Sequence, residues 1–313
     1  MTALRDDLTR WGPSAGPLAV SLAEAEAYAR RLAQSHYENF PVVSWLLPRR
    51  LHQHFYNVYA FCRWADDLGD EIGDPAESLR LLAWWRDELA HCYRGEPRHP
   101  VFVALAPTIE RFGIPVDPFA DLISAFEQDQ RVMEFDTFAQ LRDYCRRSAD
   151  PVGRIVLRLC ERSTPQTMAW SDSICTGLQL ANMWQDVARD LDIGRIYLPR
   201  EDRDRCGYTD ADLCARTTNP AFLDLMRFQV DRARQLLLGG LPVADAMPGR
   251  LKVEIELFAQ GGLAILREIE RIGYRVWEQR PVLTTRHFAA ILFHTVGRRL
   301  WGGWSRRPAA VPH

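Results

Sequence analysis

Two carboxylates stand one helical turn apart in the segment 59–71. Asp66 and Asp70 are four residues apart, so they share one face of a helix. Arg63 and Tyr59 precede Asp66 by three and seven residues and extend that face backwards. We call Tyr59, Arg63, Asp66 and Asp70 the first acidic stripe.

A second segment repeats this spacing. Asp186 and Asp190 are again four residues apart, and Asn182 and Gln179 extend their face backwards. We call these four residues the second acidic stripe. The surrounding segment 165–191 is apolar on most of its circumference, which predicts a helix at the centre of a bundle. Unpaired polar groups are costly to bury there, so the stripe indicates a function.

The two stripes together predict a metal and diphosphate site. Carboxylates one turn apart repel each other by about 0.2–0.5 kcal/mol, so two such pairs in apolar helices need compensating cations. Mg²⁺ prefers oxygen ligands and takes few of them from protein when phosphate is present. Facing stripes would hold Mg²⁺ and a diphosphate, whose departure leaves a carbocation in an apolar cavity. The predicted metal ligands are Asp66, Asp70, Asn182, Asp186 and Asp190.

Three other interpretations compete with this one. The stripes could be two solvated acidic faces with incidental spacing, although their matched polar neighbours argue against it. A di-iron bundle needs two Glu-x-x-His pairs on separate core helices. The pairs ending at His91 and His99 are too close in sequence for that. A helical lipid-binding or assembly protein without catalysis would not need the paired aspartates.

The elements that must position these residues are helices throughout. Apolar periodicity predicts about ten, at roughly 21–34, 48–72, 75–89, 101–112, 118–134, 138–162, 165–191, 220–238, 250–277 and 285–297. Pro107 and Pro151 are expected to kink or break two of them. No alternating strand pattern or linker appears. We predict one all-α domain over residues 17–300, with flexible segments at 1–16 and 301–313.

Composition limits the class of protein. The 313 residues are 47% hydrophobic and 26% charged, with a net charge of −2, which excludes a disordered chain and gives no basic face for nucleic acid. The seven cysteines include no C-x-x-C pair, which is typical of a reducing, cytoplasmic compartment. No run of 18 apolar residues occurs. We expect a cytoplasmic protein with transient contact at the inner membrane surface.

These motifs resemble the squalene/phytoene synthase family, the head-to-head prenyltransferases, over residues 23–300. The first stripe matches the family's Asp-Asp-x-x-Asp motif, here Asp66, Asp67 and Asp70, and the second stripe matches its second acidic motif. The segment Gly194-Arg195-Ile196-Tyr197-Leu198-Pro199 matches the family's Gly-Arg-x-Tyr-Leu-Pro. The resemblance implies an isoprenoid-synthase helical bundle with a central apolar cavity, about two or three Mg²⁺ ions and polyprenyl diphosphate substrates.

The resemblance also implies roles for individual residues. Arg63 and Arg195 become diphosphate ligands, against the alternative of simple salt bridges to the aspartates. His36 and Phe40 fall where the family has a His and a Phe beside the diphosphate. Asp67 points about 100° away from Asp66, so it either supports the ligands or faces solvent. The remaining expected catalytic residues, which could otherwise be core residues, are Tyr59, Tyr144, Tyr197, Tyr274 and Gln179. Arg280 is a weaker phosphate candidate.

Three departures from the family pattern favour one branch. Glu38-Asn39-Phe40-Pro41 replaces a Lys-Ser-Phe type segment, Gln185 replaces an arginine, and Arg189 replaces a glutamate. A basic residue near one diphosphate is therefore lost, and these variants look like the bacterial hydroxysqualene synthases of the hopanoid pathway. That branch ionises presqualene diphosphate and captures the rearranged cation with water, so no NADPH is expected. Enzymes before and after it in the pathway are candidate partners. Full condensation of two farnesyl diphosphates to presqualene diphosphate, squalene, dehydrosqualene or phytoene is the alternative.

Overall fold

The computed structural model describes residues 2–15, 20–35 and 47–283, which form one all-α domain, as predicted. Within these ranges the backbone forms no β-strand, only a single parallel bridge between Glu134 and Ile196. The helices are α1 (Thr2–Trp11), α2 (Leu22–Ser35), η2, a 3₁₀ turn (Arg49–Leu51), α4 (His52–Asp70), α5 (Pro75–Tyr93), α6 (Pro100–Phe112), α7 (Asp117–Asp129), α8 (Phe138–Ser148), α9 (Asp150–Leu159), α10 (Pro165–Asp192), α11 (Arg200–Cys206), α12 (Asp210–Cys214), α13 (Pro220–Gly240), α14 (Pro242–Ala246) and α15 (Leu251–Arg271).

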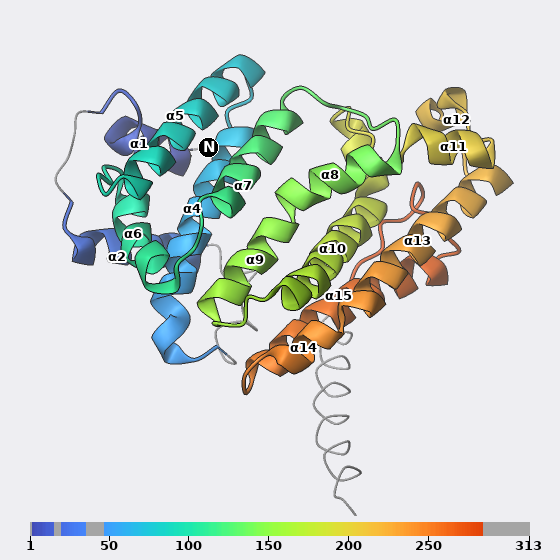
Figure 1. Cartoon of the computed structure of the whole chain (residues 1–313). Coiled ribbons are helices and arrows are strands. Elements are labelled where there is room, and N and C mark those ends of the chain that lie inside the picture. The colour runs from blue at the N-terminus through green and yellow to red at the C-terminus, as the bar shows by residue number, and fades with distance from the viewer. Residues whose placement is uncertain (1, 16–19, 36–46, 284–313) are drawn as a thin grey trace, which may run out of the picture.

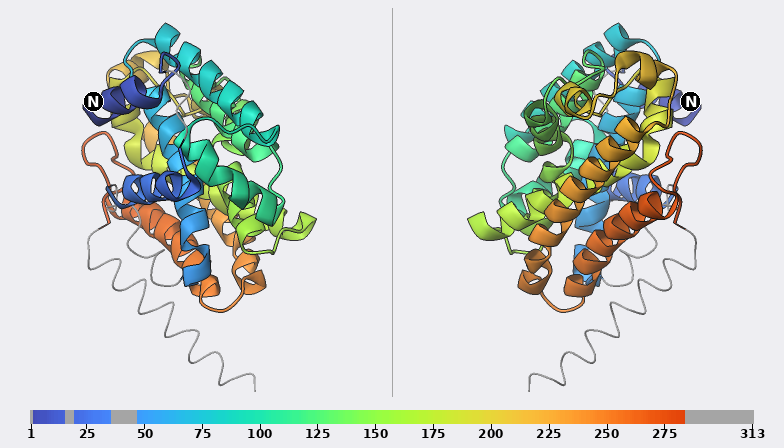
Figure 2. Two further views of the ribbon diagram at one scale, coloured as in Figure 1. Left: turned by 90° about the vertical axis from the view of Figure 1, so that its left-hand side faces the viewer. Right: turned by 90° about the vertical axis from the view of Figure 1, so that its right-hand side faces the viewer.

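Figure 1 shows how the helices are arranged. Two apolar clusters hold them together. One lies among α2, α4, α5, α6 and α7, and includes the buried Trp64 and Trp85. The other surrounds α10, which packs against α8, α9, α13 and α15, and includes Trp184 and Phe222. Both views in Figure 2 place α11 and α12 at one end of the molecule and α14 at the opposite end.

Helix α10 forms where the sequence predicts it and lies at the centre of its cluster. Thr164 caps its first turn by accepting a hydrogen bond from the backbone of Thr167, and Pro165 occupies the first helical position. A side chain at Gly177 would place its Cβ 2.8 Å from Leu237, so the glycine allows α13 to approach closely. Close packing on several sides explains why α10 is apolar around most of its circumference.

Proline has different effects on two other predicted helices. The predicted helix 138–162 is divided at Pro151: α8 ends at Ser148, and α9 starts at Asp150 with the proline in its first turn. Pro107 does not end α6, which continues to Phe112. A proline near a helix start loses no hydrogen bond because that N–H has no partner in any case.

Several predicted boundaries were wrong. The helix expected at 118–134 ends at Asp129, and the one expected at 250–277 ends at Arg271. After α15 the chain takes a left-handed turn, with φ of 64° at Gly273 and 61° at Tyr274. The short helices α11, α12 and α14 were not predicted, because five to seven residues are too few for a periodic pattern. The predicted helix 285–297 lies outside the described residues.

The N-terminal segment that we expected to be flexible contains α1. The side chain of Leu4 is 7% exposed, and Asp7 accepts a 2.8 Å hydrogen bond from the Tyr28 hydroxyl of α2. The flexibility of this segment stays a prediction, and so does that of the tail 301–313. Among the described helices, none is both long and apolar enough to cross a bilayer.

Candidate active site

The first acidic stripe lies on α4, mostly in its C-terminal half, where one arginine contacts three carboxylates. The Arg63 guanidinium pairs with Asp66 at 3.4 Å, with Glu71 at 3.0 Å, and with Asp67. The side chains of Asp66 and Asp70 remain 44% and 49% exposed. The two predicted ligands therefore remain accessible, while Arg63 offsets part of their mutual repulsion.

Asp67 faces the protein interior rather than solvent. Its side chain is 13% exposed and pairs with Arg63. Burial raises the pKa of Asp67 to about 6, although the arginine acts in the opposite direction. Of the two positions open for Asp67 in the sequence, the structure supports the one in which it holds Arg63 beside the ligands.

The second acidic stripe, on the last turns of α10, receives its positive charges from elsewhere in the chain. Arg280 donates to both carboxylate oxygens of Asp186, from Nε at 2.5 Å and from Nη2 at 3.1 Å. Arg189 is 67% exposed and lies 3.9 Å from the same carboxylate. Burial, followed by the neighbouring Asp186, raises the pKa of Asp190 to about 7, and Arg195 opposes this. Of the two amides in the stripe, Asn182 is exposed and Gln179 is half-buried.

Gln185 explains how Arg280 reaches Asp186. The Gln185 amide donates a 2.6 Å hydrogen bond to the carbonyl oxygen of Pro281. This contact fixes the segment after α15 against α10, directly beside Arg280. The glutamine therefore does not present a free polar group at the position where the family commonly has an arginine.

Arg195 joins the two stripes. Its backbone N–H donates to the carbonyl oxygen of Asp190 at 2.7 Å, and its guanidinium lies 3.4 Å from the carboxylate of Asp70. This ion pair connects the C-terminal end of α4 with the segment that follows α10. Arg63 and Arg195, the two arginines predicted to bind the diphosphate, both contact aspartates.

The donors fit a magnesium ion that is shared with a substrate. Among the described residues, no three His, Cys, Asp or Glu side chains converge on one ready-made metal position. Mg²⁺ commonly takes only one or two carboxylates and completes its shell with water and phosphate oxygens. Partly exposed Asp66 and Asp70 on α4, together with Asp186 and Asp190 on α10, supply oxygens of that kind, and Arg195 connects the two helix ends.

An aromatic group lies beside Arg195 and contains a carboxylate that the sequence analysis missed. The rings of Phe135, Tyr144 and Tyr197 have centroids 5.5–6.1 Å apart. The Tyr144 hydroxyl donates a 3.1 Å hydrogen bond to Asp129, which is 9% exposed. Burial raises the pKa of Asp129 to about 6, and Arg195 opposes this. The sequence signal that could have identified Asp129 was an acidic residue at the end of the largely apolar segment 118–129.

The other predicted residues are distributed more widely. Tyr59 is half-buried, and burial raises its pKa, with smaller and opposing contributions from Arg63 and Asp66. Tyr274 follows α15, and the Arg227 guanidinium lies 5.4 Å from its ring centre. No described contact connects Tyr274 with either acidic stripe. His36 and Phe40 lie outside the described residues, as do Glu38 and Asn39.

Comparisons with known proteins agree with this geometry. The family model for squalene/phytoene synthase matches residues 33–287. A hydroxysqualene synthase from Sinorhizobium fredii is 31% identical, over 89% of this chain and 96% of the relative. A phytoene synthase from Arthrospira platensis is 30% identical, over 82% of this chain and 87% of the relative.

A solved structure extends the similarity to the fold. Squalene synthase HpnC from Alicyclobacillus acidocaldarius is 45% identical, with a TM-score of 0.78. The match covers 83% of this chain and 98% of that structure. The residues matched by the family model include both acidic stripes, and we conclude that this chain belongs to the squalene/phytoene synthase family.

Proposed function

We propose that this protein converts presqualene diphosphate to hydroxysqualene in a Mg²⁺-dependent reaction. The observation that carries the proposal is the junction of the two acidic stripes at Arg195 and Asp70. It supplies carboxylate oxygens for Mg²⁺ and arginines for a single diphosphate. The family acts on polyprenyl diphosphates, and hydroxysqualene synthases are among the relatives.

The reaction balances without a reductant. The bond between the substrate carbon and the diphosphate oxygen breaks, and the cyclopropylcarbinyl cation rearranges. A water oxygen then forms the new carbon–oxygen bond and releases one proton. Bound Mg²⁺ would lower the charge of the departing diphosphate. Arg63 and Arg195 would exchange carboxylate contacts for phosphate oxygens, and the rings of Tyr144 and Tyr197 would face the cation, which aromatic faces attract.

The position of Gln185 favours a pocket for one diphosphate rather than two. Two diphosphates held together repel strongly in a low-dielectric site unless cations offset their charge. The Gln185 side chain carries no charge and is committed to the carbonyl oxygen of Pro281. Arg189, the added positive charge, is largely exposed. Both observations support a substrate whose two farnesyl units are already joined.

Full head-to-head condensation is the second candidate, because phytoene synthases match this chain as well as hydroxysqualene synthases do. The test is a set of incubations with Mg²⁺, using farnesyl diphosphate or presqualene diphosphate, each with and without NADPH. We expect hydroxysqualene from presqualene diphosphate alone, with rate and product unchanged by NADPH. Any efficient C30 product from farnesyl diphosphate would establish the condensing alternative. Squalene that appears only with NADPH would indicate a reducing squalene synthase. No turnover of either substrate, with substrate still bound, would favour the non-catalytic lipid-binding reading.

Contact with a membrane surface stays a prediction and has its own test. A C30 product is nearly insoluble in water, so the enzyme needs an acceptor bilayer or partner. We expect flotation with liposomes to recover the protein reversibly, with more in the lipid fraction when substrate is loaded. If all of the protein stays in the lipid-free fraction, direct transfer of the product to the next enzyme of the pathway would be favoured instead.

A further inference from the structure

The segment that carries Arg195 and Tyr197 has no regular structure of its own but is tied to the segment 133–136. The amide of Ile196 donates to the carbonyl oxygen of Met133 at 2.7 Å. The amides of Arg200 and Glu201 donate to the carbonyl oxygens of Phe135 and Asp136, both at 2.9 Å. This pairing brings the ring of Phe135 against that of Tyr197, with an interplanar angle of 22°.

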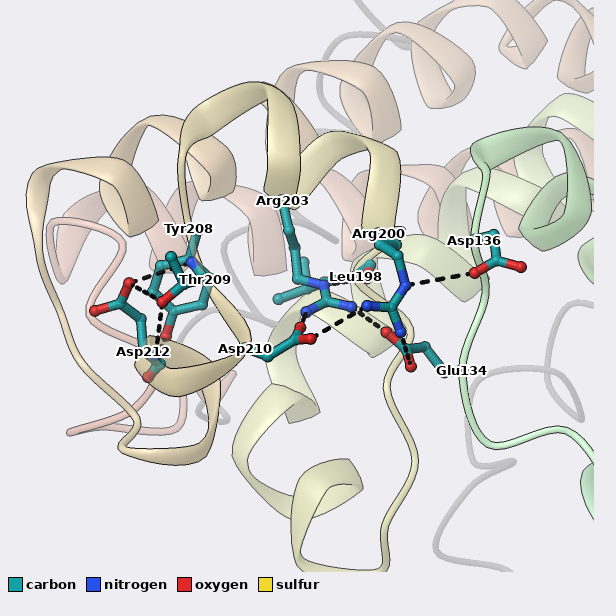
Figure 3. A network of polar contacts seen from close by, with 9 residues as sticks. All are labelled: Glu134, Asp136, Leu198, Arg200, Arg203, Tyr208, Thr209, Asp210 and Asp212. Atoms are coloured by element: carbon teal, nitrogen blue, oxygen red, sulfur yellow. Dashed lines mark hydrogen bonds and ion pairs between the residues drawn. The ribbon is translucent and has the colours of Figure 1, made fainter.

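A buried arginine contacts both of the paired segments (Figure 3). Arg203 of α11 is only 1% exposed, and its guanidinium binds Glu134 and Asp210. Its Nε donates to the carbonyl oxygen of Leu198 at 3.3 Å. Arg203 therefore contacts both paired segments at once, Glu134 on one side and Leu198 on the other.

A second arginine strengthens the same cluster. Arg200 lies 2.7 Å from Glu134, 3.2 Å from Asp210 and 3.5 Å from Asp136. Glu134 thus receives two guanidinium groups, while the neighbouring Phe135 packs on Tyr144 and Tyr197. The planar fork of arginine suits such multiple contacts, which a lysine cannot reproduce.

The cluster is not needed to attach α11 to the bundle. Asp202 of α11 already accepts hydrogen bonds from Gln229 and Arg232 of α13, at 2.8 Å and 2.6 Å. A buried ion pair is weak grounds for stability, because desolvation offsets much of its attraction. The contacts of Arg203 instead connect the two segments that carry Glu134 and Leu198.

We propose that Arg203 and Glu134 are positioning residues that hold Arg195 and Tyr197 at the active site. Neither residue touches substrate; both act through the paired segments. Small displacements of reacting groups are costly, since a misplacement of about 1 Å can reduce rate by about 100-fold. This inference rests on the proposed diphosphate chemistry of the site, but part of its test needs no substrate.

The experiment compares Arg203→Met, Arg203→Lys and the nearly isosteric Glu134→Gln. Arg154→Met is the matched control, because it removes a two-point ion pair with Asp172. Asp172 lies 14 residues before Asp186 on α10, or about 21 Å along the helix. Activity is measured on whichever diphosphate the unmodified enzyme turns over, well below each melting temperature.

The first readout is hydrogen exchange of the amides of residues 195–201. We expect Arg203→Met and Glu134→Gln to accelerate exchange at least about tenfold there, with α13 and α15 unchanged. Unchanged protection of this segment in both variants would overturn the inference, even if the unmodified enzyme proved inactive on every diphosphate tested. That inactivity would count against the proposed function alone.

The second readout is kcat. Arg203→Met and Glu134→Gln should lose at least about tenfold, Arg203→Lys less, and Arg154→Met less than about twofold. If Arg203 acts through Tyr197, the two substitutions are not independent. The double variant Arg203→Met, Tyr197→Phe should then lose less kcat than the product of the fold-losses of the two single variants. Full multiplication of the losses, an equal loss in Arg154→Met, or faster exchange without a loss of kcat would each contradict a positioning role.

Discussion

The two acidic stripes look alike in sequence, yet they obtain their positive charges in different ways. The first obtains most of its positive charge from its own helix, because Arg63 of α4 contacts Asp66 and Asp67, whereas Asp70 pairs with a distant arginine, Arg195. The second depends on distant chain segments, since Arg280 reaches Asp186 from 94 residues away. Asp66 therefore keeps its arginine partner when distant segments change, whereas Asp186 has Arg280 beside it only when the segment after α15 is in place.

The largest expected effect tests whether both stripes are needed for the Mg²⁺-dependent reaction. Asp186→Asn and Asp66→Asn should each reduce kcat by at least about 100-fold, the scale of losing one preorganised electrostatic partner. The chain should still fold, because removing one of two like charges relieves repulsion. Steady-state kinetics across Mg²⁺ concentrations measures this effect.

Asp172→Asn is the control, since it makes the same change on α10 outside the stripe and should leave kcat within about twofold. Near-normal activity in Asp66→Asn with a large loss in Asp186→Asn would show that only the α10 stripe holds metal. Near-normal activity in both variants would remove the two-stripe model.

An intermediate effect separates the local arginine from the distant one. Arg63→Gln leaves three neighbouring carboxylates without their shared partner, and we expect it to lower the free energy of unfolding by about 1–3 kcal/mol. Arg280→Gln should change stability little but raise KM for the diphosphate about tenfold, because a charged hydrogen-bond donor is lost near the ligands. Denaturant titration and substrate kinetics on both variants decide the matter. Equal destabilisation by Arg280→Gln and Arg63→Gln would contradict the distinction between a local arginine that stabilises its helix and a distant one that mainly serves substrate binding.

The smallest expected effect is on the pH dependence of stability, and it compares a buried carboxyl that has no cationic partner within the described part of the chain with one that pairs with an arginine. Burial raises the pKa of Glu254 from 4.5 to about 8, and its Oε2 has no hydrogen-bond partner among the described residues. Burial raises the pKa of Asp67 only to about 6, because the neighbouring Arg63 lowers it. A carboxyl with a raised folded-state pKa holds its proton longer in the folded chain, so it lowers stability as pH rises from its unfolded pKa to its folded one.

Glu254→Gln should therefore raise the melting temperature by a few degrees at pH 8.5, about 1 kcal/mol or more, with no gain near pH 4.5. Asp67→Asn should gain less at pH 8.5, because it also loses the contact with Arg63. Thermal melts in EDTA at several pH values provide the measurement. A gain in Glu254→Gln that is the same at both pH values would mean that its charge is not the cause.

Local sequence was enough for much of the fold and for the placement of each acidic stripe on one helix face. Periodicity located the central helix at 165–191, and α10 spans Pro165–Asp192. The spacing of four residues placed each aspartate pair on one face, a property of a single helix. Helix ends were less predictable: the left-handed turn at Gly273 and Tyr274 closes α15 several residues before its apolar pattern stops.

Only the tertiary structure decided which charges meet. The partners of Asp186, Asp70 and Glu134 come from Arg280, Arg195 and Arg203, between 69 and 125 residues away in sequence. A chain with 39 basic residues, all arginine except Lys252, offers many candidates of identical chemistry for each acid. Arginine side chains reach several ångströms from their backbone, so the choice depends on how helices cross rather than on local spacing. The sequence determined where the acidic stripes stand, and the tertiary packing determined which distant arginines neutralise Asp70 and Asp186.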